Sequence, residues 1–299
     1  MQIGIDVGAT KIEYIVLDDN GEESGRSRID CPQNYSSIIK SIKDIVSKIE
    51  NNLKKQLPIG VCHPGIHSTQ TGLIKNSPNC NWIENKPFQK DLREAIGREV
   101  FCENDANCFT LSEAIDGAGK HYKIVFGVIL GSGVGGGLVI DKKIVTGLHG
   151  ITGEWGHNQL PIIGKDKIIK KTNLREGEIE NSISGLSLAK NFKKIYNKDL
   201  TAREIFKLYR NHDLDAEKII DEFKDNLAMA IASVVNILDP DVFIFGGGLS
   251  NEIDFFDEIQ LKVKKFVAGN EFEGTMLKPK FGDASGVRGA ARLGRTMSY

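Results

Sequence analysis

The chain has 299 residues, 39 basic and 40 acidic side chains, and 40% hydrophobic residues. This balance is typical of a soluble globular protein large enough for two domains, and it excludes the basic footprint of a nucleic-acid-binding protein. The five cysteines form no C-x-x-C pair, which argues against a disulfide framework or a zinc ribbon and favours a reducing, cytoplasmic location. We see no signal peptide and no apolar run long enough to cross a bilayer, so we expect no membrane partner.

The first predicted element is a strand, a turn and a second strand over residues 2–17. Its turn, Gly8-Ala9-Thr10-Lys11, offers backbone N–H groups, a hydroxyl and an ammonium group that could hold phosphate oxygens. The turn lacks the G-x-x-x-x-G-K-[ST] pattern, and a strand follows it where a P-loop has a helix. An ordinary hairpin turn and a phosphate-holding turn therefore both stay open here.

The next segments are predicted from apolar spacing and from turn residues. A turn at residues 18–21 leads to a third strand near residues 25–29, and apolar residues at spacings of three and four predict a helix over residues 36–55. A buried strand is expected over residues 57–62. The loop-rich segment that follows contains Gly65 and Asn79, and a short helix is expected over residues 91–96. Asn79 could donate to a ligand, and capping of its own loop is the simpler interpretation.

A polar junction at residues 104–107 separates a predicted short strand at residues 98–101 from a helix that begins near Ala106 and continues over residues 109–118. Asp105 stands in it between Asn104 and Asn107. Asp or Asn at a helix N-terminus is commonly a cap, because the first N–H groups have no partner in the helix. The alternative is a general base: a carboxylate fixed at a strand end, beside an amide that orients a hydroxyl.

A second hairpin is predicted around the glycine run 131–137. A nearly continuous apolar strand over residues 123–130 precedes the run, and a strand over residues 138–140 follows it. The run contains a G-x-G-x-x-G match, but a dinucleotide-binding fingerprint must open a helix, so we reject that interpretation. The chain therefore holds two similar hairpins, and each turn could hold phosphate oxygens.

The remaining segments include a polar motif and a glycine turn. Glu154 and His157 lie three residues apart among glycines, which favours a polar pocket. Residues 164–177 are rich in lysine and are expected to be a solvent-exposed loop. Gly246-Gly247-Gly248 follows a predicted strand, in a position where a flat ring or a phosphate could approach the backbone. The other predicted elements are helices at residues 201–209 and 215–238, a helix from residue 252 or 254 to residue 267, a strand at 276–280 and a closing helix at 282–291.

Taken together, these motifs resemble the ROK family of sugar kinases, in the actin-like ATPase superfamily, over essentially the whole chain. The motifs that carry the resemblance are Ile5-Asp6-Val7-Gly8-Ala9-Thr10-Lys11, Glu103-Asn104-Asp105-Ala106-Asn107, the run 131–137, Gly153-Glu154-Trp155-Gly156-His157, Asp239-Pro240-Asp241 with residues 246–248, and the stretch 282–291. Details in residues 156–161, 235–241 and 286–291 look most like the bacterial fructokinase (manno-fructokinase) branch. The N-acetylglucosamine kinase branch is close behind.

The resemblance implies an α/β, two-lobed actin-like ATPase (ribonuclease H-like) fold with a cleft between the lobes. The N-terminal lobe would span residues 1–117, joined by the C-terminal helix, and the C-terminal lobe would span residues 118–299. The implied activity is ATP-dependent phosphorylation of the 6-hydroxyl of a hexose, with fructose as the first choice. An N-acetylglucosamine or a glucose/mannose kinase is the alternative. A pseudokinase or a sugar-binding regulator is more remote, because ROK repressors carry an N-terminal helix-turn-helix and this chain opens on a strand.

The resemblance also implies roles for individual residues. Asp105 would be the base that takes the proton from the sugar 6-hydroxyl. The residues implied to hold the sugar are Gly65, Asn79, Asn104, Glu154, His157 and Glu180. The residues implied to contact ATP are Gly8, Thr10, Lys11, Ser132 and Gly133 at the phosphates, Gly247 and Gly248 at the adenosine, and Asp6 near Mg²⁺.

The chain departs from the family pattern in one segment. Many ROK proteins bind zinc through the histidine of the G-E-x-G-H motif and three cysteines of a C-x-C-G-x-x-G-C-x-E run. Residues 171–180 contain no cysteine here, so we expect no structural zinc. Family habit suggests a homodimer, and small-molecule sugar and ATP are the expected partners.

Overall fold

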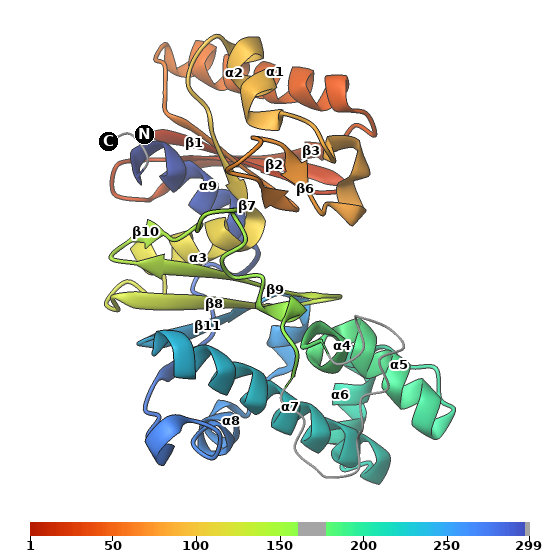
Figure 1. Ribbon diagram of the computed structural model, residues 1–299. Helices are drawn as coiled ribbons and strands as arrows, with labels where there is room; N and C mark the ends of the chain where they lie inside the picture. The colour runs from red at the N-terminus through yellow and green to blue at the C-terminus, as the bar shows by residue number, and fades with distance from the viewer. Residues whose placement is uncertain (161–177, 297–299) are drawn as a thin grey trace. The chain divides into compact units, whose positions relative to one another are not determined.

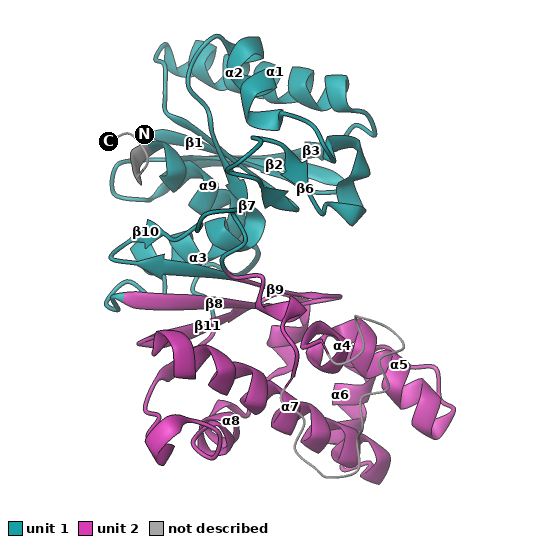
Figure 2. Cartoon of the chain, in the orientation of Figure 1, with its two compact units in different colours: residues 1–123, 137–152, 279–299 teal, residues 124–136, 153–278 magenta. Residues whose placement is uncertain are grey.

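A computed structural model describes residues 1–160 and 178–296 of the chain. These residues form two compact units, which Figure 2 shows in different colours. Unit 1 contains residues 1–123, 137–152 and 279–299, and unit 2 contains residues 124–136 and 153–278. The predicted lobe boundary between residues 117 and 118 stays a prediction, and each unit is described here on its own.

Unit 1 is built on a five-stranded mixed sheet with the strand order β3-β2-β1-β4-β7 (Figure 1). Its strands are β1 (Gln2–Val7), β2 (Lys11–Leu17), β3 (Glu23–Asp30), β4 (Ile59–His63) and β7 (Phe101–Asn104). β1 and β2 form an antiparallel hairpin, whereas β1, β4 and β7 are parallel to one another. The carboxyl ends of these three parallel strands therefore meet at one edge of the sheet, where ligands bind in open α/β sheets.

Helices cover both faces of this sheet. They are α1 (Tyr35–Leu53), α2 (Phe88–Ile96), α3 (Asp105–Ile115) and α9 (Ser285–Thr296). The apolar stripe of α1 packs with α2 into the main core of unit 1, and Asn34 caps the first turn of α1 by accepting from the N–H of Ser37 at 2.9 Å. α9 packs on the sheet through β1 and β4 and against α3. The last helix of the chain thus completes the unit that the N-terminus begins.

Unit 1 also contains the segment predicted to be rich in loops. It holds the small hairpin β5 (Ile66–His67) and β6 (Ile74–Lys75), followed by the 3₁₀ helix η1 (Pro78–Ile83). The short strand β10 (Lys143–Ile144) pairs with the end of β9 (Val134–Ile140) in the same unit. Near the C-terminus, the 3₁₀ helix η5 (Gly282–Ala284) leads into α9.

The second five-stranded sheet has the order β10-β9-β8-β11-β12. Its other strands are β8 (Ile124–Leu130), β9 (Val134–Ile140), β11 (Val242–Gly246) and β12 (Thr275–Leu277). β11 is parallel to both β8 and β12. The helices of unit 2 are α4 (Glu180–Ile183), α5 (Gly185–Tyr196), α6 (Ala202–Arg210), α7 (Leu214–Leu238) and α8 (Phe256–Val263), with 3₁₀ helices η2 (Trp155–His157), η3 (Gly248–Glu252) and η4 (Ala268–Asn270).

Three local predictions are wrong. The strand predicted at residues 98–101 lies at Phe101–Asn104, because this later stretch pairs with β4. Glycines 135–137 belong to β9 and not to the turn, since a Cβ at Gly136 would lie 2.9 Å from the Trp155 ring and the oxygen of Gly127. The helix predicted from residue 252 or 254 to residue 267 is the shorter α8, and Ile253 between η3 and α8 is extended.

Among the helices in residues 1–160 and 178–296, none is both long and apolar enough to cross a membrane.

Candidate active site

Functional side chains of unit 1 gather where the parallel strands end. Asp6 of β1 pairs in register with Cys62 of β4, which pairs in turn with Glu103 of β7. The register brings the ends of three separate stretches of sequence side by side, and the thiol of Cys62 hydrogen-bonds to Asp6. The motif containing Asp6 and the motif containing Asp105 are therefore adjacent in space.

Asn104, and not Asp105, caps helix α3. Its Oδ1 accepts from the N–H of Ala106 at 2.8 Å and from that of Asn107 at 3.3 Å, and its Nδ2 donates to the carbonyl of Gly65 at 2.9 Å. Cap and general base were both open for this junction, and the structure gives the cap to Asn104. Asn104 ties the helix to the loop after β4, which leaves Asp105 at the first helical position.

The Asp105 carboxyl is accessible to solvent, and one of its two oxygens accepts a hydrogen bond. Its Oδ1 accepts from the N–H of Ala106 at 2.8 Å. The protein around it raises the pKa of the carboxyl by desolvation, and the hydrogen bonds from Ala106 and Asn104 oppose this rise. A fixed, accessible carboxylate with a raised pKa is suited to accept a proton from an alcohol.

Asp6 and Asp105 repel each other electrostatically. Burial raises the pKa of Asp6 to about 7, with the charge of Asp105 as the next cause, and the hydrogen bond from Cys62 opposes the rise. Two carboxyl groups that repel each other resist simultaneous ionisation in the absence of a cation. Carboxylate oxygens are ligands that Mg²⁺ accepts, so the donor chemistry of Asp6 fits a magnesium ion on nucleotide phosphates.

The two other predicted sugar contacts of unit 1 differ in their surroundings. Gly65 has φ +86°, and a Cβ there would lie 2.7 Å from the oxygen of Lys75, so only glycine fits this turn. Its carbonyl accepts from Asn104, as described above. Asn79 lies exposed in η1, without a hydrogen bond from its side chain among those found in residues 1–160 and 178–296.

The first hairpin turn is closed by its own backbone. The N–H of Gly8 donates to the carbonyl of Lys11 at 2.9 Å, and Thr10 is exposed. The ammonium of Lys11 is bound to the carboxylate of Asp30 on β3. A phosphate at this turn would therefore compete with Asp30 for Lys11.

The second hairpin turn, residues 131–133, joins β8 to β9. The N–H of Gly131 donates to the carbonyl of Gly133 at 3.0 Å. Glu180 reaches this turn from α4: its Oε2 accepts from the N–H of Val134 at 2.9 Å. A residue predicted to hold sugar is thus bonded directly beside Ser132 and Gly133, which are predicted to hold phosphate.

His157 lies on η2 and Glu154 directly precedes it, and the tryptophan between them anchors this helix. Trp155 is buried, donates from Nε1 to the carbonyl of Gly135 at 2.8 Å, and packs edge-on against Phe126. His157 Nε2 lies 3.5 Å from Glu154 Oε2, and both side chains are partly exposed. The carbonyl of Asn158 accepts from Ile179 at 2.8 Å, which places η2 beside the start of α4 and hence of Glu180.

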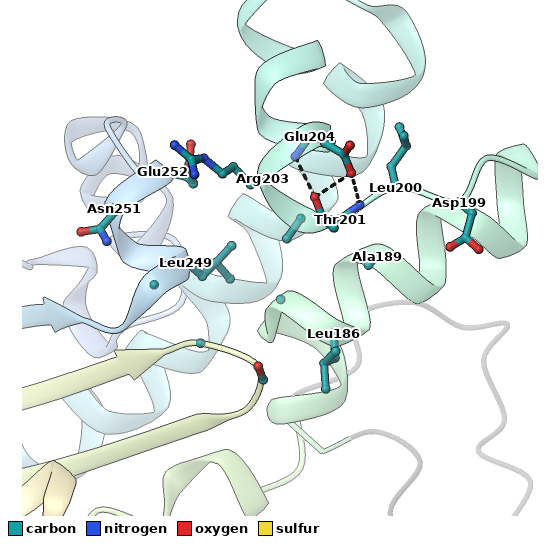
Figure 3. Close-up of a pocket in the computed structure, with 15 residues that line it drawn as sticks. Leu186, Ala189, Asp199, Leu200, Thr201, Arg203, Glu204, Leu249, Asn251 and Glu252 are labelled. Atoms are coloured by element: carbon teal, nitrogen blue, oxygen red, sulfur yellow. Dashed lines mark hydrogen bonds and ion pairs between the residues drawn. The ribbon is translucent and has the colours of Figure 1, made fainter. Parts of the chain in front are cut away.

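Unit 2 contains a cavity of about 840 Å³ (Figure 3). Ser132 from the turn and Gly248 from η3 line it together, whereas Gly133 and Gly247 are not among its lining residues. Only glycine fits at position 247, because φ is +85° and an added Cβ would lie 2.4 Å from the backbone oxygen of Leu130. The other lining residues are Gly131, Gly185, Leu186, Ala189, Asp199, Leu200, Thr201, Ala202, Arg203, Glu204, Leu249, Asn251 and Glu252.

Most of this cavity was missed from the sequence. Besides the predicted segments around Ser132 and Gly248, its walls come from the starts of α5 and α6, which carry no phosphate or ring motif. Thr201 and Glu204 form a capping box, which is visible as the T-x-x-E pattern but predicts only a helix start. The carboxylate of Glu252 is held by Arg210 at 2.6 Å and Arg203 at 3.5 Å. In unit 1 the sequence likewise gave no role to Cys62, whose position at a strand end was the available signal.

Within the part of the chain that the structure describes, no three His, Cys, Asp or Glu side chains gather as they would around a metal ion. The predicted solvent loop at 164–177 and most of the segment that lacks the zinc cysteines lie outside the described residues. The expectation of a zinc-free protein therefore stays a prediction.

Known proteins are similar to this chain in sequence and in fold. The ROK family model matches residues 2–297. The chain is 36% identical to the N-acetyl-D-glucosamine kinase of Histophilus somni, over 98% of both chains. The crystal structure of a ROK hexokinase from Thermus thermophilus matches with a TM-score of 0.86 at 25% identity, covering 98% of this chain and 97% of that one.

A second solved structure that is similar to this chain contains bound ligands. The ROK family glucokinase of Streptomyces griseus, in complex with glucose and AMPPNP, has a TM-score of 0.75 at 25% identity and covers 98% of this chain and 99% of that one. These matches confirm the predicted two-lobed α/β fold class. The chain belongs to the ROK family.

Proposed function

We propose that this protein is an ATP-dependent kinase that phosphorylates the 6-hydroxyl of N-acetylglucosamine. The coarser class, a sugar kinase of the ROK family, follows from the family match and the full-length relatives. The finer assignment rests on one observation: 36% identity, over 98% of both chains, to an enzyme named N-acetyl-D-glucosamine kinase. Fructose, the first choice from the sequence motifs, has no such support among the relatives described above, so the alternative becomes the proposal.

In this proposal Asp105 is the catalytic base. Its Oδ1 is fixed by the N–H of Ala106, and its carboxyl is open to solvent, so a sugar hydroxyl can donate to it. The raised pKa makes the carboxylate a better proton acceptor than a fully solvated aspartate. Phosphoryl transfer requires positioning and charge neutralisation more than covalent chemistry, so one base on a rigid helix start is sufficient.

The cavity of unit 2 is proposed to take the nucleotide. Its volume of about 840 Å³ lies in the range of small-molecule sites, and its lining includes the turn residue Ser132 and the backbone of Gly248. We assign the phosphates to the glycine turns and the adenosine to the cavity. Magnesium, when bound, would neutralise phosphate charge, and Asp6 is the residue that would hold it.

As further sugar contacts we propose the residues that the family resemblance implies, which are Gly65, Asn79, Asn104, Glu154, His157 and Glu180. The carboxylates and the imidazole can each accept a hydrogen bond from a sugar hydroxyl. Since Asn104 already bonds to Gly65 and to helix α3, its contribution to the sugar would use the second hydrogen of Nδ2.

The test is an ADP-release assay with N-acetylglucosamine, glucose, mannose and fructose as separate substrates. We expect the highest kcat/KM with N-acetylglucosamine and loss of ADP release from all four sugars in Asp105→Asn. A higher kcat/KM with fructose would return the assignment to the fructokinase branch. No ADP release with any of the sugars would remove the proposed activity.

A further inference from the structure

Glu180 contacts the second hairpin turn with one of its two carboxylate oxygens. Oε2 accepts from the N–H of Val134 at 2.9 Å, across 46 positions of sequence. The same oxygen lies 2.6 Å from where a Cβ of Gly133 would be, so the absence of a side chain at residue 133 makes room for the carboxylate. The turn and the acid are therefore shaped to fit each other.

A second hydrogen bond joins the same two segments. The N–H of Gly185, at the start of α5, donates to the carbonyl of Gly131 at 2.8 Å. Residues 131–134 are thus held at both ends by residues 180–185. Since residues 131 and 132 also line the cavity, the position of α4 and α5 fixes one wall of it.

A role in helix capping does not explain this arrangement. Glu180 is the first residue of α4, but that helix has only four residues, and the carboxylate bonds to Val134 on β9. The other oxygen, Oε1, makes no hydrogen bond found within residues 1–160 and 178–296. One oxygen therefore holds the turn, and the other remains for a ligand.

We propose that Glu180 is a positioning residue that fixes the phosphate-holding turn with Oε2 while Oε1 takes a sugar hydroxyl. The inference rests on the proposed function and adds to it a physical link between the nucleotide and the sugar. A carboxylate accepts more strongly than a neutral group, so its bond to Val134 holds the turn in its nucleotide-binding shape before sugar arrives. Displacement of the turn then changes nucleotide affinity even with no sugar present.

The experiment measures MgADP binding by calorimetry in the absence of sugar. Glu180→Ala removes the acceptor, and we expect the Kd to rise about ten-fold, the effect of losing one charge-assisted hydrogen bond. Glu180→Gln keeps an acceptor oxygen, so its Kd is expected within about two-fold of the wild type, while the KM for the sugar rises because the charge is lost. Glu178→Ala, a neighbouring acid without a bond to the turn, is the matched control and should bind as the wild type does.

A second measurement, amide hydrogen exchange, reports on the hydrogen bond between Val134 and Glu180 directly. Amide exchange at Val134 should be slow in the wild type and in Glu180→Gln, and fast in Glu180→Ala, while exchange in β8 stays unchanged and shows that the variant is folded. Wild-type MgADP affinity or wild-type protection of Val134 in Glu180→Ala would overturn this inference and leave the proposed function standing. A wild-type protein that binds no MgADP would overturn both.

Discussion

At the scale of single residues, Asn104 and Asp105 make different contacts although they are neighbours in the chain. The sequence placed Asn104 and Asp105 at a strand end and left cap and base open. The structure shows the carboxamide of Asn104 capping α3 and bonding to Gly65, and the carboxyl of Asp105 held at one oxygen. The sequence could not make this division, because Asn and Asp are both good caps and only the three-dimensional contacts separate them.

Asp105→Asn is expected to lower kcat by about two to four orders of magnitude, because a carboxamide cannot accept the hydroxyl proton. Sugar affinity should change little, since Asn keeps the size and one acceptor oxygen. Steady-state kinetics and sugar binding by calorimetry measure the two effects separately. Asp44→Asn, on the exposed face of α1, is the control, and full activity in Asp105→Asn would remove the assignment of the base.

Asp6 should make stability depend on pH. Its pKa is raised from 3.8 to about 7 in the folded protein, chiefly by burial and then by Asp105. The folded state therefore binds this proton more tightly than the unfolded chain does, so the stabilisation is full below about pH 4 and is lost as pH rises through about 7. Asp6→Asn cannot ionise and should raise Tm by about 2–4 °C at pH 8 while leaving it nearly unchanged at pH 4, in magnesium-free buffer. An equal Tm difference at both pH values would contradict the assigned shift.

At the scale of elements, periodic segments were predicted well and glycine-rich segments were not. Long helices such as α1 and α7 lie within a few residues of their predicted bounds, because their apolar residues repeat at helical spacing. Glycines 135–137 were assigned to a turn because glycine is common in turns. They lie in β9, where Trp155 and neighbouring backbone approach too closely for a side chain at Gly136, and such contacts are invisible in local sequence.

The crossing of α3 and α9 in unit 1 gives a prediction for an element. A Cβ at Gly289 would lie 1.7 Å from the backbone oxygen of Cys108, so the two helices can approach only with glycine at this position. We expect Gly289→Ala to lower the free energy of unfolding by about 1–3 kcal/mol, measured by urea denaturation. Gly25→Ala, on exposed β3 with no atom within 4 Å of the new Cβ, is the control. A Gly289→Ala protein as stable as this control would show that the helices can separate without cost.

At the scale of the whole molecule, the family resemblance predicted the fold class and the sugar kinase class, whereas it favoured fructose among the sugars. The motifs that define the family hold the reacting groups, which are common to kinases of different hexoses. If Asn79 lies in the sugar site as proposed, sugar preference depends on the shape of the loop around it, and short motifs do not encode that shape. Much of the cavity was found only in the structure for a similar reason, since the starts of α5 and α6 line it without a motif.

The absence of the family's three cysteines predicts a protein without structural zinc. Tetrahedral zinc needs four protein ligands, and His157 alone cannot supply them. Metal analysis of the purified protein should find far less than one zinc per chain, and removal of trace metal with a chelator should leave Tm unchanged. Stoichiometric zinc would show that other residues replace the cysteines.

The most direct test of the account is a competition experiment. Equimolar N-acetylglucosamine and fructose are offered together with limiting ATP, and the products are separated and identified by mass and by the position of the phosphate. The account predicts that N-acetylglucosamine 6-phosphate dominates and that Asp105→Asn forms neither product at a comparable rate. A mixture dominated by fructose 6-phosphate, or phosphate on a hydroxyl other than the 6-position, would contradict it.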